Sequence, residues 1–268
     1  MNLGEYEATL AIPLCARAME ARRSRPIICD PHALRLVGAL GIECESLAIP
    51  RQTQITLCMR ARQIDRWISR FLEQHDDAVV IQLGSGLDTR FERLDNGRVI
   101  WYELDLPSVA SLRSELLPED PRQRTLGYSV TDFAWMDQIE TKDSPVTVVA
   151  EGLLMYLSEE SVGELVSHLA EGFRESHLIF DCYSVMTARN IGRHPSLRRT
   201  GASVKWGMDD AGKLPGMERG FRLEEEWSFT QSEDVALLPA PYRLAFVIAH
   251  LIPAARRAHR LLRYRSIR

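Results

Sequence analysis

The 268-residue chain has no long hydrophobic run, and its longest apolar stretch, Leu244 to Ala255, is interrupted by His250 and Pro253. A membrane-spanning helix needs about 20 apolar residues, so we expect no part of the chain to cross a bilayer. The opening residues, MNLGEYEATL, show neither the basic nor the hydrophobic region of a secretory signal. The five cysteines form no CxxC pair, a pattern that predicts reduced intracellular thiols without a disulfide or a metal site. These absences predict a cytoplasmic protein.

No internal repeat and no linker rich in Gly, Ser or Pro divides the sequence, which predicts a single domain over residues 1–268. The net charge of −4 is unevenly spread, because residues 241–268 contain seven arginines and no acidic residue. We interpret this basic C-terminal segment as an amphipathic helix whose arginines form the solvated face. Binding of nucleic acid is the less favoured alternative, because no aromatic residues alternate with the arginines to stack on bases.

The middle of the chain alternates strand and helix patterns. Predicted strands are AVVIQL (78–83), RVIWYELD (98–105), the start of VTVVAEGLLMYL (146–157) and HLIFDCY (177–183). Their nearly continuous apolar character is typical of strands covered on both faces, and hence of a parallel sheet. An apolar stripe at helical spacing follows Ser158, a suitable N-cap, and predicts a helix between the last two strands. This βαβ rhythm indicates a doubly wound α/β fold.

Four regions differ in character. Residues 1–75 predict a helical cap, in which the segment from Gln54 to Glu73 carries one apolar stripe. Residues 76–184 form the predicted cofactor-binding core, and residues 185–240, rich in Gly, Pro and charges, are interpreted as a lid insertion. The basic segment 241–268 completes the chain.

A glycine loop follows the first predicted strand. Gly84 and Gly86 flank Ser85, and Asp105 ends the next strand 19 residues after Gly86. Glycines at this place let a backbone approach a ligand closely, and an acid about 20 residues on accepts hydrogen bonds from ribose hydroxyls. The pattern predicts a site for a nucleoside-containing cofactor. The alternative is a tight turn, with Asp105 merely ending its strand.

The residues after the loop favour S-adenosylmethionine over a nicotinamide dinucleotide. Thr89 occupies the position where the dinucleotide fingerprint needs a third small residue. Asp88 would repel a phosphate, and S-adenosylmethionine has a ribose but no phosphate. We therefore place Gly84, Gly86, Asp88 and Asp105 among the cofactor-binding residues.

Three stretches, VVIQLGSGLDTRFERL, WYELDLP and VVAEGLLMYLSEE, resemble the leucine carboxyl methyltransferase family and its bacterial tetracenomycin-type polyketide O-methyltransferases. Together with upstream ARAMEARRSRPIICDPHA and RARQIDRWI, the resemblance covers residues 15–183. It implies a mostly parallel, seven-stranded class I methyltransferase sheet with a helical N-terminal cap and a lid. It also implies methyl transfer from S-adenosylmethionine to an oxygen.

The resemblance suggests further site residues. Ser129 and Val130 stand where family members hold the adenine with an Asp-Leu pair, so this chain departs from the pattern at Ser129. Glu151 matches a family glutamate near the methionine end of the cofactor; a purely structural carboxylate is the alternative. We suggest that Tyr156 orients the methyl acceptor, although a core tyrosine fits the pattern equally well.

Arg60 lies on the inward side of its predicted helix. At 100° per residue it shares a side with Ile64, Ile68 and Phe71, whereas Arg62, Arg66 and Arg70 lie opposite. An inward arginine is costly without an anionic partner. The methionine carboxylate of the cofactor would satisfy it, and the family has an arginine at the matching point in that role. The alternative is an internal salt bridge to Asp88 or Glu151.

The sequence thus predicts an S-adenosylmethionine-dependent O-methyltransferase acting on a small secondary metabolite such as a polyketide. A carboxylate acceptor is favoured over a phenol because no histidine stands in a motif position to act as a base. No metal-ligand spacing is present. The alternatives are a protein C-terminal carboxyl methyltransferase, a nicotinamide-dependent oxidoreductase, a nucleic-acid-binding module and a non-catalytic relative that only binds the cofactor. The oligomeric state is left open.

Overall fold

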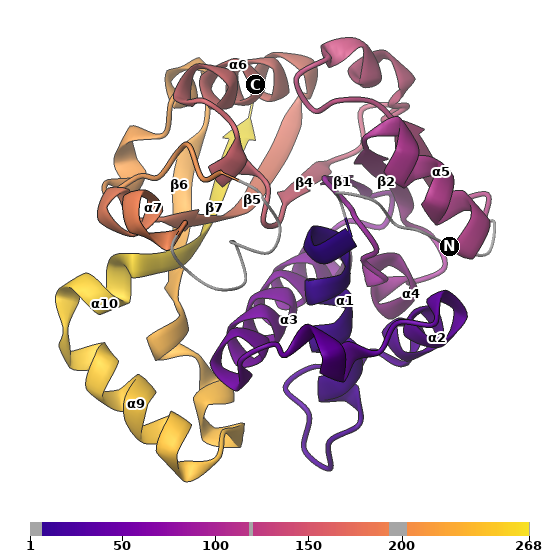
Figure 1. Ribbon diagram of the computed structural model, residues 1–268. Coiled ribbons are helices and arrows are strands. Elements are labelled where there is room, and N and C mark those ends of the chain that lie inside the picture. The colour runs from indigo at the N-terminus through magenta and orange to yellow at the C-terminus, as the bar shows by residue number, and fades with distance from the viewer. Residues whose placement is uncertain (1–6, 118–119, 193–202, 268) are drawn as a thin grey trace.

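A twisted seven-stranded sheet runs through the molecule, with helices on both faces (Figure 1). The computed structural model describes residues 7–117, 120–192 and 203–267. The strand order is β3-β2-β1-β4-β5-β7-β6, and only β7 runs antiparallel to its neighbours. The strands are β1 (Val79–Leu83), β2 (Ile100–Asp105), β3 (Gln123–Gly127), β4 (Val146–Ala150), β5 (Glu175–Tyr183), β6 (Arg222–Ser228) and β7 (His259–Ile267). The predicted seven-stranded, mostly parallel sheet is confirmed.

The central strands β1 and β4 are buried along their whole length. On one face, Ile81 and Val148 pack against helix α6 (Glu159–Gly172). On the other face, Val80 and Val149 pack against the apolar stripe of α3 (Arg51–Gln74). Because successive side chains of a strand point to opposite faces, a nearly continuous apolar run is what this two-sided burial requires.

The helix signals in the sequence are also confirmed. The Oγ of Ser158 accepts a hydrogen bond from the backbone N–H of Ser161 at 3.1 Å and caps α6. Helix α3 covers the predicted segment and extends three residues earlier, to Arg51. Short helices α4 (Arg90–Leu94) and α5 (Pro107–Leu116) follow β1 and β2.

The N-terminal segment is helical, as predicted. Helices α1 (Glu7–Ala21) and α2 (Pro31–Leu40) pack together beside α3, and a short 3-10 helix spans Cys44–Leu47. The prediction that all cysteines are reduced is wrong, because Cys15 and Cys44 form a disulfide between α1 and this 3-10 helix. Their Cα atoms lie 5.3 Å apart although 29 residues separate them in sequence. The fold brings the two thiols together, and no spacing rule signals that contact. Cys29, Cys58 and Cys182 are free.

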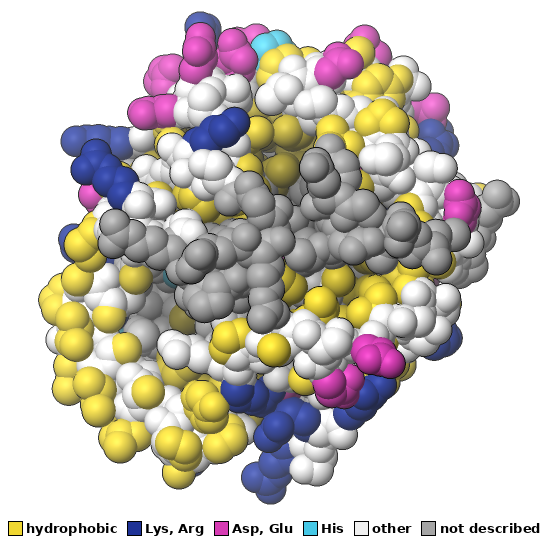
Figure 2. All heavy atoms as spheres, viewed as in Figure 1, with side chains coloured by type: hydrophobic (Ala, Val, Ile, Leu, Met, Phe, Trp, Pro, Cys, Tyr) yellow, Lys and Arg dark blue, Asp and Glu magenta, His cyan; other side chains and the backbone are white. Residues whose placement is uncertain are grey.

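The segment interpreted as a lid contributes in part to the sheet. It contains α7 (Val185–Ile191) and the edge strand β6, and residues 193–202 within it lie outside the described part of the chain. After β6 the chain projects as an arm that carries α9 (Ala240–Leu251) and α10 (Pro253–Ala258) (Figure 1). The arm exposes a row of apolar side chains, visible over α9 in Figure 2: Leu244, Val247, Ile248, Leu251 and Ile252.

The prediction of one C-terminal amphipathic helix is wrong, because residues 259–267 form strand β7 between β5 and β6. Leu262 and Tyr264 point into the main core, and Arg263 packs over the ring of Trp67 on the other face. Three arginines of β7 form ion pairs with glutamates of the neighbouring strands: Arg260 with Glu226, Arg263 with Glu224 and Glu225, and Arg265 with Glu175. From Leu262 to Ser266, buried and half-buried side chains alternate, as they do in a strand paired on both sides, and not with the period of a helix.

Candidate active site

A cavity of about 670 Å³ opens at the carboxyl ends of β1, β2, β4 and β5, under α1 and α3. It lies where the strand order reverses between β1 and β4, the crevice in which doubly wound sheets bind their ligands. Its volume falls within the range of about 300 to 1,000 Å³ that is typical of small-molecule sites. Seven of the predicted site residues line it: Arg60, Gly84, Gly86, Asp88, Asp105, Glu151 and Tyr156.

The glycine loop after β1 has the backbone that its sequence predicts. Gly84 and Gly86 adopt positive φ angles of 62° and 52°, a region that side chains of L-residues rarely enter. A Cβ on Gly84 would lie 3.1 Å from Cδ1 of Leu153, and one on Gly86 would lie 3.3 Å from Cδ2 of Leu10. The loop thus keeps its backbone open to the cavity.

Asp105 holds this loop from the end of β2. Its Oδ2 accepts the Gly86 N–H at 2.7 Å, and its Oδ1 accepts the Leu106 N–H at 2.7 Å. Burial raises the pKa of Asp105 above its ordinary value, although both N–H donors oppose that shift. The two backbone contacts fix the plane of the carboxylate. Asp105 lines the cavity, and each of its oxygens can accept a further hydrogen bond from a ligand there.

Two buried polar atoms beside this loop have no partner within the described residues. They are the Oε1 of Gln82, on β1, and the Oγ of Ser85. Both residues line the cavity. A buried polar atom without a hydrogen bond costs free energy, so these atoms indicate a polar ligand at this end of the cavity.

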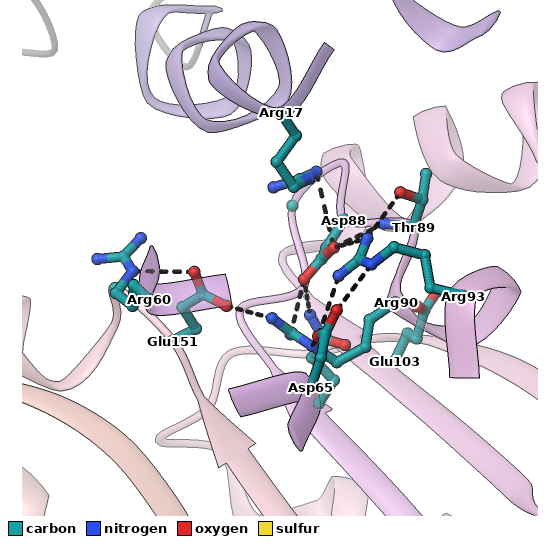
Figure 3. Close-up of polar contacts among 12 residues, drawn as sticks. Arg17, Arg60, Asp65, Asp88, Thr89, Arg90, Arg93, Glu103 and Glu151 are labelled. Atoms are coloured by element: carbon teal, nitrogen blue, oxygen red, sulfur yellow. Dashed lines mark hydrogen bonds and ion pairs between the residues drawn. The ribbon is translucent and has the colours of Figure 1, made fainter. Parts of the chain in front are cut away.

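Asp88 stands in a network of buried charges (Figure 3). Its carboxylate meets Arg90 at 2.7 Å and Arg93 at 3.2 Å from α4, and Arg17 of α1 at 3.6 Å. Despite its burial, these guanidinium groups hold the pKa of Asp88 well below its usual range. Arg17 and Arg93 also contact Asp30, and Arg90 and Arg93 contact Asp65. The network clamps α1, α3 and α4 against the end of β1.

Glu151 bridges this network to Arg60 (Figure 3). Its Oε2 accepts from Arg90, and its Oε1 accepts from Nε of Arg60 at 2.9 Å. Arg60 is only 7% exposed, as its helical position predicts, and its Nη1 donates to Oδ2 of Asp181 at 2.8 Å. The internal salt bridge to Glu151 that the sequence left open is therefore present. The remaining nitrogen of Arg60, Nη2, has no hydrogen-bonding partner within the described residues, and Arg60 lines the cavity.

The far end of the cavity is lined by aromatic and apolar side chains. Tyr156, from the 3-10 helix Leu154–Tyr156 after β4, lies there with Tyr183 at the end of β5. Burial raises the pKa of both phenols, so each is a neutral hydrogen-bond donor. Met155, Leu57, Thr187 and Ile191 also line the cavity.

His259, at the start of β7, also lines the cavity and escaped the sequence prediction. Its Nε2 lies 2.8 Å from Oδ2 of Asp181. The two residues are 78 positions apart and meet only because β7 pairs with β5. The one local signal is the alternation of apolar and basic residues from Leu262 to Arg265 on the same strand, which the helical interpretation concealed.

Ser129 and Val130 do not line the cavity. The Oγ of Ser129 contacts Oγ1 of Thr131 at 2.9 Å, and the carbonyl of Val130 accepts from the indole N–H of Trp135 at 3.3 Å. Asp132 caps the following 3-10 helix. The assignment of an adenine contact to Ser129 and Val130 stays a prediction without a geometric counterpart.

No group of three or more His, Cys, Asp or Glu side chains within 7–117, 120–192 and 203–267 is arranged to hold a metal ion. Over the same residues, no helix combines the length and apolar character needed to cross a membrane.

The strand order, with its antiparallel β7 and a cavity at the switch point, defines the fold of the class I S-adenosylmethionine-dependent methyltransferases. A proposed S-adenosylmethionine-dependent methyltransferase from Listeria monocytogenes superposes with a TM-score of 0.53 at 13% identity, over 78% of this chain and 99% of that one. The open glycine loop, the fixed Asp105 carboxylate and the partnerless Gln82 and Ser85 atoms fit such a cofactor.

Sequence comparison specifies the family. The leucine carboxyl methyltransferase model matches residues 11–170. The tetracenomycin polyketide synthesis O-methyltransferase of Streptomyces glaucescens is 35% identical over 98% of both chains. An S-adenosyl-L-methionine-dependent methyltransferase of Gibberella zeae is 29% identical over 84% of this chain and 83% of its own. The chain belongs to the leucine carboxyl methyltransferase family, and it is an S-adenosylmethionine-dependent O-methyltransferase. The oxidoreductase alternative is thereby set aside.

Proposed function

We propose that this enzyme methylates an oxygen of a small aromatic, polyketide-like molecule. The observation that carries the proposal is the cavity at the switch point, whose lining includes both the polar glycine loop and Tyr156, Tyr183 and apolar side chains. A planar aromatic acceptor matches that wall in shape and polarity. The relative from Streptomyces glaucescens, similar over nearly its whole length, supports an acceptor of the polyketide class.

The residues divide the work along this cavity. Asp105 would accept the ribose hydroxyls, and the glycine loop would let the cofactor lie against the backbone. Arg60, through Nη2, would bind the methionine carboxylate while its other nitrogens stay paired. When bound, the cofactor supplies an electrophilic methyl group on a cationic sulfur. The chain aligns the acceptor oxygen with that methyl group and excludes water, and alignment is the main source of acceleration for such a displacement.

The charge of the buried network suits a cationic ligand. Within the described residues, Arg17, Arg60, Arg90 and Arg93 face five carboxylates: Asp30, Asp65, Asp88, Glu151 and Asp181. The excess negative charge favours a sulfonium ion over a neutral thioether.

Nucleic acid is not a proposed partner, because Arg260, Arg263 and Arg265 of the basic C-terminal segment are paired with carboxylates of this chain. The proposal of a cytoplasmic location is based on the sequence alone.

Calorimetric titration with S-adenosylmethionine tests the cofactor site. Asp105→Asn, which removes the carboxylate charge, should weaken binding about 10- to 100-fold. Asp137→Asn, at an exposed position, is the matched control and should bind like the wild type. Equal affinities of the three proteins would contradict the assignment of Asp105.

Turnover then tests the acceptor. The wild type is assayed by liquid chromatography and mass spectrometry with a panel of aromatic hydroxy acids and with a peptide that ends in leucine. Methylation of the aromatic compounds supports the proposal. Methylation of the peptide alone would contradict it and favour a protein C-terminal carboxyl methyltransferase.

A further inference from the structure

Asp181 and His259 form a buried pair at the acceptor end of the cavity. Asp181 is fully buried on β5, and three groups donate to it: Nη1 of Arg60 at 2.8 Å, Nε2 of His259 at 2.8 Å and the Gly152 N–H at 2.5 Å. These donors, Arg60 foremost among them, hold the pKa of Asp181 below its usual range although burial opposes the shift. Asp181 is therefore an anion that can only accept hydrogen bonds.

The ionised state of Asp181 decides which nitrogen of His259 carries the proton. Since Asp181 has no proton to donate, Nε2 of His259 must be the N–H donor at 2.8 Å. In the neutral imidazole, Nδ1 then carries a free lone pair. No residue in the described part of the chain makes a hydrogen bond to Nδ1, and the ring belongs to the cavity wall.

Several groups set the protonation of His259. The aromatic rings of Tyr183 and Phe229 lie 4.4 Å and 4.6 Å from the imidazole, centroid to centroid. The charged and titratable groups that act on it come from three elements: Asp181 and Tyr183 on β5, Arg60 on α3, and Glu151 directly after β4. Tyr156 lines the same cavity. Burial lowers the pKa of His259 below its ordinary value, and Asp181 opposes that shift. The imidazole is neutral at pH 7, while Asp181 is placed to stabilise the imidazolium once it forms.

We propose that His259, oriented by Asp181, is the general base that removes the proton from a hydroxyl acceptor, so that the methylated group is a phenolic or enolic hydroxyl. This inference rests on the proposed function, the methylation of a small aromatic molecule, and narrows the group on that molecule that accepts the methyl. A carboxylate is already ionised at neutral pH and needs no base. A carboxylate acceptor would give the pair no catalytic role, and Asp181 would place one more negative charge beside it.

The step balances as a displacement coupled to a proton transfer. The hydroxyl proton moves to Nδ1 of His259, and a lone pair of the acceptor oxygen forms the new C–O bond with the methyl carbon. The C–S bond of the cofactor breaks, and its electron pair stays on sulfur, which becomes a neutral thioether. The imidazolium then releases its proton to water.

One probe separates hydroxyl from carboxylate chemistry. 4-Hydroxybenzoate carries both groups on one planar ring, and its phenol stays protonated at neutral pH, so its methylation needs a base. Its phenolate absorbs at a longer wavelength than its phenol, and chromatography separates its methyl ether from its methyl ester. Wild type, His259→Gln and His250→Gln are compared. His250, on α9, contacts Thr230 and does not line the cavity, so His250→Gln is the matched control.

We expect the wild type and His250→Gln to form the ether. His259→Gln should lose ether formation by about 10²- to 10⁴-fold, the usual contribution of a general base. The rate of ether formation should fall on acidification in the wild type, because the imidazole becomes protonated, and this acid limb should be absent in His259→Gln. In His259→Ala, added imidazole should restore part of the lost rate, an effect that a merely structural histidine would not show.

A binding measurement supplies a readout without turnover. With S-adenosylhomocysteine present, the phenol of the bound probe should ionise at a lower pH in the wild type than in His259→Gln, as its ultraviolet difference spectrum reports. Calorimetry with S-adenosylhomocysteine shows whether each variant still folds and binds. Failure of the wild type to bind S-adenosylmethionine or S-adenosylhomocysteine would contradict the proposed function itself. If the wild type binds but forms only the ester, forms the ether equally well as His259→Gln, or leaves the hydroxyl neither ionised nor methylated, the role of His259 is overturned.

Discussion

Replacement of Arg60 by methionine should destabilise the fold and weaken cofactor binding together. Arg60→Met keeps much of the side-chain volume but removes the cation that contacts Glu151 at 2.9 Å and Asp181 at 2.8 Å. Asp181 is fully buried, and only the His259 and Gly152 donors remain to it. Removing one partner of a buried ion pair costs about 3 to 5 kcal/mol, because the other charge is left uncompensated.

That cost converts to a measurable shift in melting temperature. A chain of 268 residues unfolds with an entropy of about 0.56 kcal/mol per kelvin. A loss of 3 to 5 kcal/mol therefore lowers Tm by about 5 to 9 °C. Scanning calorimetry and urea unfolding would measure the loss. The matched control is Arg70→Met, on the same helix but at an exposed position, which should change stability by less than about 0.5 kcal/mol.

Binding of S-adenosylmethionine separates the two roles of Arg60. If its free Nη2 binds the methionine carboxylate, Arg60→Met should also weaken affinity by about 10- to 100-fold at a temperature where the variant is fully folded. A variant that unfolds like Arg70→Met would refute the reasoning about buried charge. A destabilised variant with wild-type affinity would instead leave Arg60 as a purely internal salt-bridge partner.

Three further perturbations have defined outcomes. Cys44→Ser removes the disulfide that closes a loop of 29 residues, and it should lower the free energy of unfolding, measured in urea, by about 3 to 4 kcal/mol. A reductant should shift the urea midpoint of the wild type to that of the variant. An unchanged midpoint would contradict the disulfide. Burial, with help from Arg263 and Arg265, lowers the pKa of His177 to about 4, whereas the unfolded chain protonates near pH 6.5. Wild type should therefore lose about 3 kcal/mol more than His177→Gln as the pH falls from 7 to 4, and parallel pH curves would count against this assignment. Gly84→Ala should lower the free energy of unfolding by about 1 to 2 kcal/mol, because an alanine is strained at a φ of 62°. It should also weaken cofactor binding, because the new Cβ would lie 3.1 Å from Leu153 and shift the loop. A variant with the melting temperature and affinity of the wild type would show that the loop is not under this constraint.

Local patterns predicted the scaffold and the polar end of the site. The apolar runs that became β1, β2, β4 and β5 are buried on both faces, so two-sided burial leaves a clear mark in sequence. The inward position of Arg60 followed from helical periodicity alone. The glycine loop and Asp105 were predictable because strand, turn and strand-end acid lie within about 20 residues of one another.

The acceptor end of the cavity was not predictable in the same way. His259 reaches the site on the one antiparallel strand, which an arginine-rich composition made resemble a helix face. Its partner Asp181 is 78 residues away, and Cys15 and Cys44 meet across a loop of 29 residues. Contacts of this kind depend on how whole helices and strands pack against one another.

The sequence by itself determined the strands β1, β2, β4 and β5 and the helices α3 and α6, the place where the backbone opens toward a cofactor, and which arginine of α3 points inward. Each of these properties depends on neighbours within one or two turns or strands. Only the tertiary structure decided the partners of the buried charges: Glu151 and Asp181 for Arg60, 91 and 121 residues away, and Asp181 for His259. The physical reason is that an ion pair requires its members to be buried in contact, and that contact is set by the packing of the sheet and helices rather than by local spacing.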